Sequence, residues 1–254
     1  MAKIYLDSGH GGTDPGAAAN GLQEKNVTLS LALKTRDILN RDYDGHTIRM
    51  SRTSDTTLSL AQRTNDANSW GADYFVSIHI NAGGGTGYED YIFNGSVSNN
   101  TVTYRDKLHA EIMRQVDFNN RGKKRANFHV LRESGMPAVL TENGFIDTVA
   151  DANKLKSDAY LNRIALGHAN GIAQALGLSR KSGGGSGQGY VEVITPSLWT
   201  YNTPDWDDRA VIVSQGEVFT VARDRFQVGN GYMYQLKSGL YITASTQYVR
   251  YFTR

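Results

Sequence analysis

A glycine- and serine-rich stretch at residues 179–189 divides this 254-residue sequence into two parts. The stretch contains no large apolar side chain to bury, and its glycines leave the backbone free, so it predicts a flexible linker. A long surface loop inside one domain is the alternative interpretation. Because the apolar pattern differs in kind on the two sides, we expect separate domains at residues 1–178 and 190–254.

In the first part, short apolar runs typical of strands alternate with segments of helical periodicity. The last helical segment, Tyr160–Leu176, carries apolar residues at spacings of three and four, so one of its faces is suited to packing. This alternation predicts an α/β fold with a twisted, mostly parallel sheet covered by helices. The strands are expected at Lys3–Leu6, Thr47–Met50, Tyr74–Ile80, Tyr88–Phe93, Phe128–Leu131 and Ala138–Leu140, and the other helices at Val27–Leu39, Leu58–Ser69 and Val102–Phe118.

After the linker the helical period disappears, and short β-rich runs are separated by turn residues such as Gly229-Asn230-Gly231. This pattern predicts a small all-β barrel. The segment contains equal numbers of acidic and basic residues, so we expect its recognition surface to use aromatic side chains and hydrogen bonds. The expected strands are Tyr190–Ile194, Ala210–Val213, Val218–Ala222, Tyr232–Leu236, Leu240–Thr243 and Tyr248–Phe252.

The composition argues against several classes of function. The formal net charge is +2, and no basic run that would make a phosphate stripe is found, so nucleic-acid binding is not expected. The chain has no cysteine, which leaves His, Asp and Glu as candidate metal ligands. No apolar run is long enough to span a bilayer, and no Sec-type signal is visible. We therefore expect a protein made in the cytoplasm that reaches an external substrate only after release.

One histidine follows the first predicted strand, and another lies near the end of a later strand. His10 lies in a glycine-flanked turn, and His79 lies within Tyr74–Ile80. Taken singly, His10 is typical of a local hydrogen-bonding turn and His79 of a buried core histidine. Together with Glu24, at the start of the next helix, they suggest one site, because a parallel sheet gathers its strand ends into one crevice. Two histidines and one carboxylate with an open fourth position are typical of catalytic zinc sites.

A base near the metal is the remaining requirement. Glu142 follows the predicted strand Ala138–Leu140, which would bring its carboxylate to the same edge of the sheet. A solvated glutamate that opens a turn is the competing interpretation. Near the metal, Glu142 would take a proton from the attacking water and return it to the leaving amine.

Five motifs in order resemble the zinc-dependent N-acetylmuramoyl-L-alanine amidases of bacterial autolysins and phage endolysins. The resemblance covers residues 3–178 and implies a fold similar to that of zinc carboxypeptidases. It also implies that His10, Glu24 and His79 bind Zn²⁺, that Glu142 is the catalytic carboxylate, and that the substrate is the amide bond between N-acetylmuramic acid and L-alanine. The motifs are Leu6–Gly12, Glu24, Ser51-Arg52 with Leu60–Arg63, Ser77–Ala82 and Met136–Phe145.

The second part resembles bacterial SH3-type wall-binding domains. Together with the absence of a visible signal peptide, this resemblance suggests a phage or prophage endolysin that acts on the peptidoglycan of a Gram-positive wall, with no nucleic-acid or membrane partner. Trp199, Tyr201 and Trp206 are candidates for wall binding, although packing inside the barrel explains each equally well. The resemblance lies in Leu198–Tyr201, Gly216–Phe219 and Ser238–Thr243.

Two other functions compete with the amidase. A zinc peptidase of peptidoglycan would use the same ligands on a peptide bond, and a catalytically inactive wall-binding protein would have lost a ligand or the base. Among the remaining candidates, His129 either lines the cleft or serves packing. Arg52 and Arg63 either position substrate carboxylates or brace the site by ion pairs, and bracing is the favoured interpretation. The structural histidines are expected to be His46, His109 and His168.

Overall fold

The structure, a computed structural model, describes residues 1–181 and 189–253. The chain divides into two compact units, Met1–Arg180 and Lys181–Arg254. Residues 182–188, most of the predicted linker, lie outside the described residues. None of the helices in the described ranges has the length and apolar character needed to cross a membrane.

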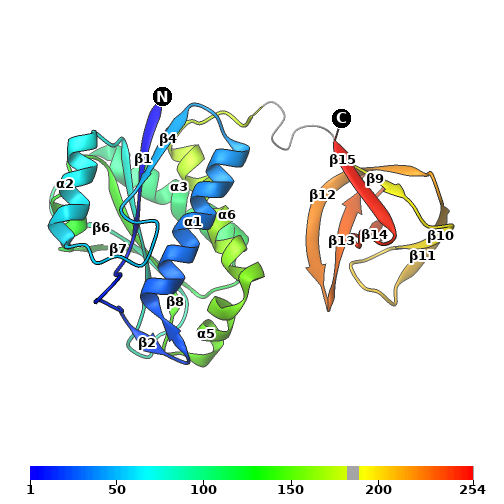
Figure 1. Cartoon of the computed structure of the whole chain (residues 1–254), viewed down its shortest axis with the longest axis horizontal. Helices are drawn as coiled ribbons and strands as arrows, with labels where there is room; N and C mark the ends of the chain where they lie inside the picture. Colours follow the sequence, from blue (N-terminus) through cyan, green and yellow to red (C-terminus); the bar gives the residue numbers. More distant parts are fainter. Residues whose placement is uncertain (182–188, 254) are drawn as a thin grey trace. The chain divides into compact units, whose positions relative to one another are not determined.

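A six-stranded sheet forms the centre of the first unit (Figure 1). Its strands, in spatial order, are β4 (His46–Met50), β1 (Ala2–Ser8), β5 (Tyr74–Asn81), β8 (Ala138–Phe145), β6 (Tyr88–Phe93) and β7 (Asn120–Ala126). The first four run parallel, whereas β6 is antiparallel to β8 and β7 is parallel to β6. The loop 82–87 is too short for a parallel crossover, so β6 returns in the opposite direction. The sheet is therefore mixed.

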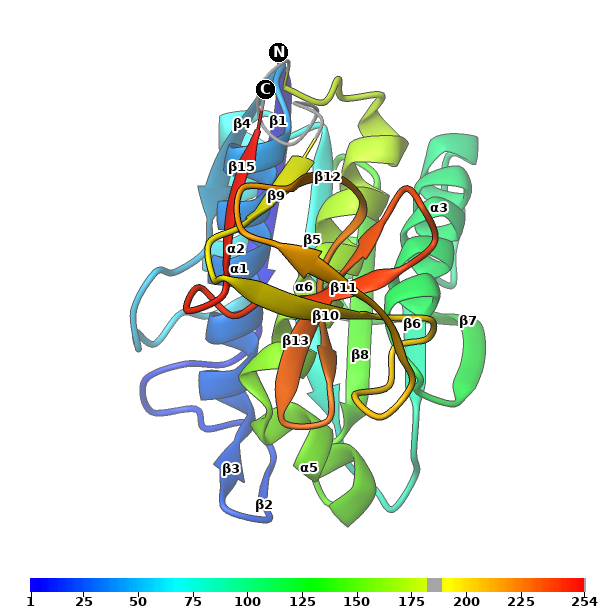
Figure 2. The ribbon, with the colours of Figure 1, turned by 90° about the vertical axis from the view of Figure 1, so that its right-hand side faces the viewer.

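Helices cover both faces of this sheet. On one face, α1 (Glu24–Asp42), α6 (Asp158–Leu176) and α3 (Asn99–Gln115) lie side by side (Figure 2). They form the larger apolar core, in which Leu31 and Ile112 pack with Val76 of the sheet. The other face is covered by α2 (Leu60–Trp70) and α4 (His129–Arg132), whose Leu131 packs with Phe75. A short hairpin of β2 (Ala18–Ala19) and β3 (Leu22–Gln23) leads into α1, and α5 (Val149–Lys156) precedes α6.

Two glycines allow α6 to approach α3 closely. A Cβ atom on Gly167 would lie 2.6 Å from Ile112 Cα, and one on Gly171 would lie 2.7 Å from Leu108 Cα. Both distances are well below van der Waals contact, so a larger residue would push the helices apart. His168 lies between these glycines in the sequence and is fully buried.

The expected strand at Phe128–Leu131 is wrong. The backbone amides of Leu131 and Arg132 both donate to the carbonyl oxygen of Phe128, at 3.0 Å, so the segment closes a helical turn that becomes α4. The strand beside β6 is instead β7, which was not expected. Four of the five residues 121–125 are lysine or arginine, so β7 has no apolar alternation that would mark it as a strand.

The second unit consists of one antiparallel sheet, which confirms the expected all-β second part. Its core contains Val191, Val213, Leu236 and Ile242. The strand at 197–201 was not expected. In spatial order the strands are β11 (Arg209–Ser214), β10 (Ser197–Tyr201), β14 (Tyr241–Thr243), β13 (Gly231–Leu236), β12 (Val218–Val228), β9 (Gly189–Val193) and β15 (Val249–Thr253).

Candidate active site

The turn after β1 presents His10 at the carboxyl end of the parallel strands. His10 has a φ of 60°, which is rare for a residue with a side chain, so the turn must be held by its surroundings. Arg63 donates to the carbonyl of His10 at 2.8 Å, and Arg52 donates to that of Gly9 at 3.0 Å. Burial alone would raise the pKa of Asp7, but the Arg63 guanidinium, 2.7 Å away, lowers it. Both arginines therefore brace the turn, as interpreted from the sequence.

Glu24, the first residue of α1, places its carboxylate between the two histidines. Its Oε2 lies 3.2 Å from Nε2 of His10, and its Oε1 lies 3.0 Å from Nδ1 of His79. Backbone amides of Ala17 and Ile80 donate to the same two oxygens at 2.9 and 3.0 Å. The potential ligand atoms of the three residues all lie within 4.8 Å of one another. The structure thus brings together the three residues predicted to bind a metal.

These groups strongly influence one another's ionisation. Burial would raise the pKa of Glu24, but its interactions with His10 and His79 hold that pKa far below its usual range. Burial would lower the pKa of His10, but the carboxylates of Glu24 and Asp14 raise it. Asp14 was not expected from the sequence. It lies 2.8 Å from Nδ1 of His10 and so fixes the imidazole with Nε2 facing the cluster.

Glu142 lies beside this cluster. It is opposite His79 in the pairing of β5 with β8, and opposite Glu89 in the pairing of β8 with β6. Its Oε2 atom is buried and has no hydrogen-bond partner in the described part of the chain. Burial, together with the carboxylates of Glu24 and Glu89, raises the pKa of Glu142 well above its usual range. A raised pKa makes a carboxylate a stronger base, which suits a group that must accept and return a proton.

The cluster fits a divalent metal ion. Two imidazoles and one carboxylate are the protein ligands of many catalytic zinc sites. Two glycines make room for the three side chains to converge. A Cβ on Gly16 would lie 2.6 Å from Oε2 of Glu24, and one on Gly9 would lie 2.4 Å from Cε1 of His79.

Comparison with known proteins assigns the family. Residues 4–174 match the family model described as N-acetylmuramoyl-L-alanine amidase. The chain belongs to this amidase family. The sequence resemblance to these amidases is thereby confirmed, and residues 186–249 match a second family that is described as a domain of unknown function.

Curated relatives and solved structures agree with the assignment. The chain is 62% identical over 182 residues to the N-acetylmuramoyl-L-alanine amidase CwlM of Bacillus licheniformis, covering 72% of each protein. It is 42% identical over 264 residues to the endolysin of Bacillus phage SPP1, covering 97% of each. The catalytic domain of the amidase CwlV from Bacillus (Paenibacillus) polymyxa var. colistinus is 33% identical, with a TM-score of 0.67 over 70% of this chain and 100% of that one.

The other histidines of the amidase unit do not join the cluster. His129 is the first residue of α4, which follows β7. The end of β7 pairs with Phe93 at the end of β6, whereas Glu142 pairs with Glu89 near the start of β6. Because β6 and β8 are antiparallel, the strand end that leads to His129 is opposite to the one near Glu142. His109 bonds Asp90 at 2.7 Å. The remaining two also have structural positions: His168 bonds Thr141 at 3.0 Å inside the core, and His46 begins β4.

A further group of charged side chains adjoins the candidate base and was not expected from the sequence. Glu89 is only 2% exposed. It accepts hydrogen bonds from Tyr91 at 2.6 Å, Asn81 at 2.8 Å, Arg121 at 2.6 Å and the ammonium group of Lys124. Burial opposes ionisation, but these donors lower the pKa of Glu89 to about 2. Contrary to the expectation of no basic run, the sequence does contain one cluster of basic residues, at 121–125, and this cluster was the available signal.

Two aspartates fix the loop 82–87, which joins the strand of the second histidine to the strand beside the candidate base. Asp147 accepts hydrogen bonds from the backbone amides of Gly83 and Gly84, at 2.7 and 2.9 Å. Asp151 accepts one from the amide of Gly87 at 2.8 Å. The loop is thus attached to the segment that follows β8, and the spacing between the strand ends is held from outside the site.

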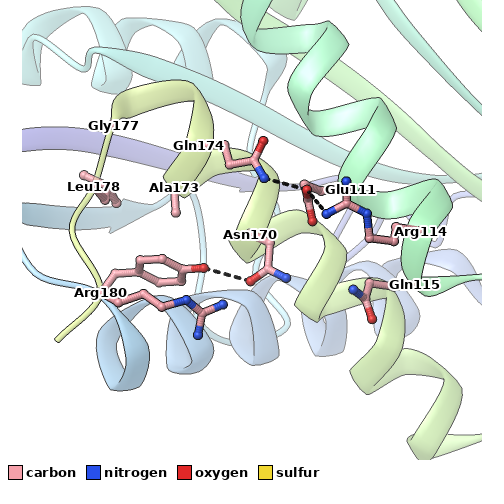
Figure 3. Close-up of a pocket in the computed structure, with 10 residues that line it drawn as sticks. Glu111, Arg114, Gln115, Asn170, Ala173, Gln174, Gly177, Leu178 and Arg180 are labelled. Atoms are coloured by element: carbon pink, nitrogen blue, oxygen red, sulfur yellow. Dashed lines mark hydrogen bonds and ion pairs between the residues drawn. The ribbon is translucent and has the colours of Figure 1, made fainter. Parts of the chain in front are cut away.

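A separate hollow lies between α1, α3 and α6, near the carboxyl end of α1 (Figure 3). Glu111 accepts hydrogen bonds there from Gln174 at 2.5 Å and from Arg114 at 2.7 Å. The hydroxyl of Tyr43 donates to Asn170 at 2.8 Å. These polar groups satisfy one another, and none of the residues predicted for the catalytic site lines this hollow.

The three aromatic candidates of the second unit differ in their surroundings. Trp206 donates from Nε1 to the carbonyl of Val228 at 2.8 Å, and its ring meets Tyr201 edge-on at 5.4 Å between centroids. Trp199 is 37% exposed, and the guanidinium of Arg209 lies 5.6 Å from its ring centroid. Trp206 therefore contributes to packing, whereas Trp199 keeps a surface on which a ligand can lie.

Proposed function

We propose that this protein is a zinc-dependent amidase that hydrolyses the bond between N-acetylmuramic acid and L-alanine in peptidoglycan. One observation carries the proposal: His10, Glu24 and His79 converge, with Glu142 paired beside His79, in a chain of the amidase family. Its relatives include two proteins named as amidases and one named as an endolysin, and these names support the same reaction.

His10, Glu24 and His79 would hold the Zn²⁺ ion, which when bound supplies a Lewis acid that activates water and the scissile carbonyl. The protein orients these ligands through their other contacts. Asp14 fixes the imidazole of His10, and the backbone amide of Ile80 fixes the carboxylate of Glu24. Such outer contacts keep the ligand atoms directed at one point.

Glu142 acts first as a general base and then as a general acid. It takes a proton from the water that attacks the lactyl carbonyl carbon. As the carbon–nitrogen bond breaks, it gives this proton to the departing amine of L-alanine. The products are the free carboxyl group of the muramic acid and a stem peptide with a free amino terminus. Because its Oε2 has no hydrogen-bond partner among the residues that the structure describes, Glu142 keeps an acceptor available for the water proton.

The second unit would hold the amidase unit at the wall, and we propose that it is an SH3-like barrel that binds peptidoglycan. Its short antiparallel strands and its sequence resemblance support this role. The match to the phage SPP1 endolysin extends over both units, because it covers 97% of each chain. We accordingly propose a phage or prophage lysin that is made in the cytoplasm, is released at lysis and acts on a Gram-positive wall.

Digestion of defined muropeptides, with and without a chelator, tests the enzymatic part of the proposal. Mass spectrometry should find intact stem peptides that begin with L-alanine, and chelation should stop their release until Zn²⁺ is restored. A peptidase would instead shorten stem peptides that stay attached to the glycan, and an inactive wall-binding protein would release nothing. The variants His10→Ala and His79→Ala should lose zinc, whereas the control His129→Ala should keep it.

A further inference from the structure

A row of polar side chains continues from the proposed metal site to the edge of the sheet. His79 of β5 pairs with Glu142 of β8, and Glu142 pairs with Glu89 of β6. Glu89 in turn contacts Arg121 and Lys124 of the edge strand β7. Residues directly opposite one another on neighbouring strands lie on the same face of a sheet. The row therefore leads from the metal site, past the base, to two cations.

Glu89 holds both cations with a single oxygen. Its Oε1 accepts hydrogen bonds from Tyr91 and Asn81, at 2.6 and 2.8 Å. Its Oε2 accepts from Nε of Arg121 at 2.6 Å and from Nζ of Lys124. The nearly buried carboxylate thus fixes the two cations in place, and the group of three keeps one excess positive charge.

The guanidinium of Arg121 points from Glu89 toward the carboxyl end of the base's strand. It lies over the ring of Phe145, the last residue of β8, with 4.8 Å between the guanidinium carbon and the ring centroid. Only Nε bonds a protein group, and within the described residues neither terminal nitrogen has a hydrogen-bond partner. The side chain is 36% exposed. Two free terminal nitrogens form the planar fork that binds a carboxylate at two points.

The neighbouring cations of β7 have other partners. Lys123 pairs with Asp106 of α3 at 3.0 Å, and Arg125 donates to the backbone carbonyl oxygens of Phe93 and Gly95, at the end of β6 and just after it. Successive residues of a strand face opposite sides of the sheet, so Lys123 and Arg125 lie on the face away from Lys124. The pairing of β6 with β7 shifts register between Asn120 and Lys123, and this irregularity lets Arg121 reach Glu89 on the face of Lys124. Arg121 and Lys124 therefore face Glu89, whereas Lys123 of the same strand does not. Lys123 can serve as a matched control.

We propose that Arg121 and Lys124 form an anion subsite that binds a carboxylate on the peptide part of the substrate. This inference rests on the proposed function, in which the scissile bond lies at the metal site. On one side of that bond is the glycan, whose hydroxyl and acetamido groups carry no charge. On the other side is the peptide, which carries carboxylates. The two cations thus orient the substrate, with its peptide running along the row toward β7.

A matched pair of soluble N-acetylmuramoyl dipeptides tests the subsite. One bears a free carboxylate on its second residue, and the other bears a carboxamide there. The unaltered protein should prefer the carboxylate in kcat/KM by about tenfold, the size of one charge-assisted hydrogen bond. Arg121→Gln and Lys124→Gln should each bring this ratio toward one. Lys123→Gln, on the same strand but the other face, should keep the full ratio.

The outcomes separate the subsite from the amidase activity. An unchanged ratio in both Arg121→Gln and Lys124→Gln would overturn the subsite and leave the amidase assignment intact. If Arg121→Gln fails to fold, Arg121→Lys decides, because it keeps the charge but loses the two-point fork; an unchanged ratio there would also overturn the subsite.

If the protein cleaved neither dipeptide, this result would contradict the proposed function instead. The subsite is then judged by calorimetric titration of the free dipeptide with the carboxylate. Weaker binding to Arg121→Gln than to the unaltered protein supports the subsite, and equal binding overturns it.

Discussion

A methyl group at position 9 offers a purely steric test of the proposed metal site. An ideal Cβ on Gly9 would lie 2.4, 2.5 and 2.7 Å from Cε1, Nε2 and Nδ1 of the His79 ring. Atoms in favourable contact lie about 3.5–4.0 Å apart, so either the ring or the turn must move by about 1 Å. Gly9 does not have a left-handed φ, so the substitution adds no backbone strain of its own.

The ring of His79 cannot move without loss, because its Nδ1 lies 3.0 Å from Oε1 of Glu24. Overpacking of this kind typically costs about 1–3 kcal/mol. Disturbing the support of a metal ligand typically lowers metal affinity by about 10–100-fold. We therefore expect Gly9→Ala to lower the free energy of unfolding by about 1–3 kcal/mol and to bind Zn²⁺ at least about tenfold more weakly.

Calorimetric titration of Zn²⁺ into metal-free protein measures the affinity, and urea unfolding measures the stability. Gly135→Ala is the matched control, since its backbone is not left-handed either and its Cβ would meet Oδ1 of Asn68 at an ordinary 3.4 Å. If Gly9→Ala bound Zn²⁺ as tightly as this control, the His79 ring could not be where the metal binds, and the reasoning would be refuted.

Three further predictions follow from the same geometry. Glu142→Gln should slow muropeptide cleavage by about two orders of magnitude or more, because it removes proton transfer. Atomic emission should find that the variant retains zinc, and loss of zinc would instead indicate that Glu142 is a ligand. Burial lowers the pKa of His168 from 6.5 to about 4, so the unfolded chain takes up the proton first as the pH falls. The contribution of His168 to the free energy of unfolding is fully present above pH 6.5 and should fall by about 3 kcal/mol as the pH falls to 4. His168→Gln should lack this fall when the unfolding of both proteins is measured against pH, and parallel curves for the two proteins would contradict the prediction. The fragment 1–178 should cleave soluble muropeptides but digest whole walls poorly, and the fragment 190–254 should sediment with walls without cutting them, because tethering raises effective concentration. Loss of soluble turnover in the first fragment would show that both units form one catalytic body.

Chemistry and periodicity suggested the candidate ligands and base at their positions in the sequence, and the resemblance to the amidases implied their roles. His10 follows β1, and His79 and Glu142 lie in the second halves of β5 and β8. Parallel strands bring such positions toward one end of the sheet. Glu24 begins the helix that follows the first turn. The strands that lead to these residues are buried, so they stand out in the sequence as apolar runs. Their positions could therefore be predicted without knowledge of contacts between distant segments of the chain.

Asp14, Glu89 and the cations of β7 could not be found in the same way. The roles of Glu89 and these cations depend on contacts between segments far apart in the chain, as when Arg121 meets Glu89. Asp14 instead reaches His10 through the conformation of the turn that they share. The basic sequence of β7 lacks the apolar alternation of a strand, and its position beside β6 follows from the reversal of chain direction after the loop 82–87. The short segment Phe128–Leu131, with three apolar residues and a histidine, likewise does not distinguish a strand from one helical turn.

The loop 82–87 is rich in glycine, but it should open only rarely. The amide hydrogens of Gly83, Gly84 and Gly87 are each donated to an aspartate carboxylate. Such amides exchange with solvent only when the loop opens, so hydrogen exchange at these glycines should be slow although the loop lies at the surface. The conformational entropy of the loop is lost once, when the chain folds. A substrate that arrives at the site therefore meets a preorganised boundary, and its binding energy is not diminished by the cost of ordering the loop.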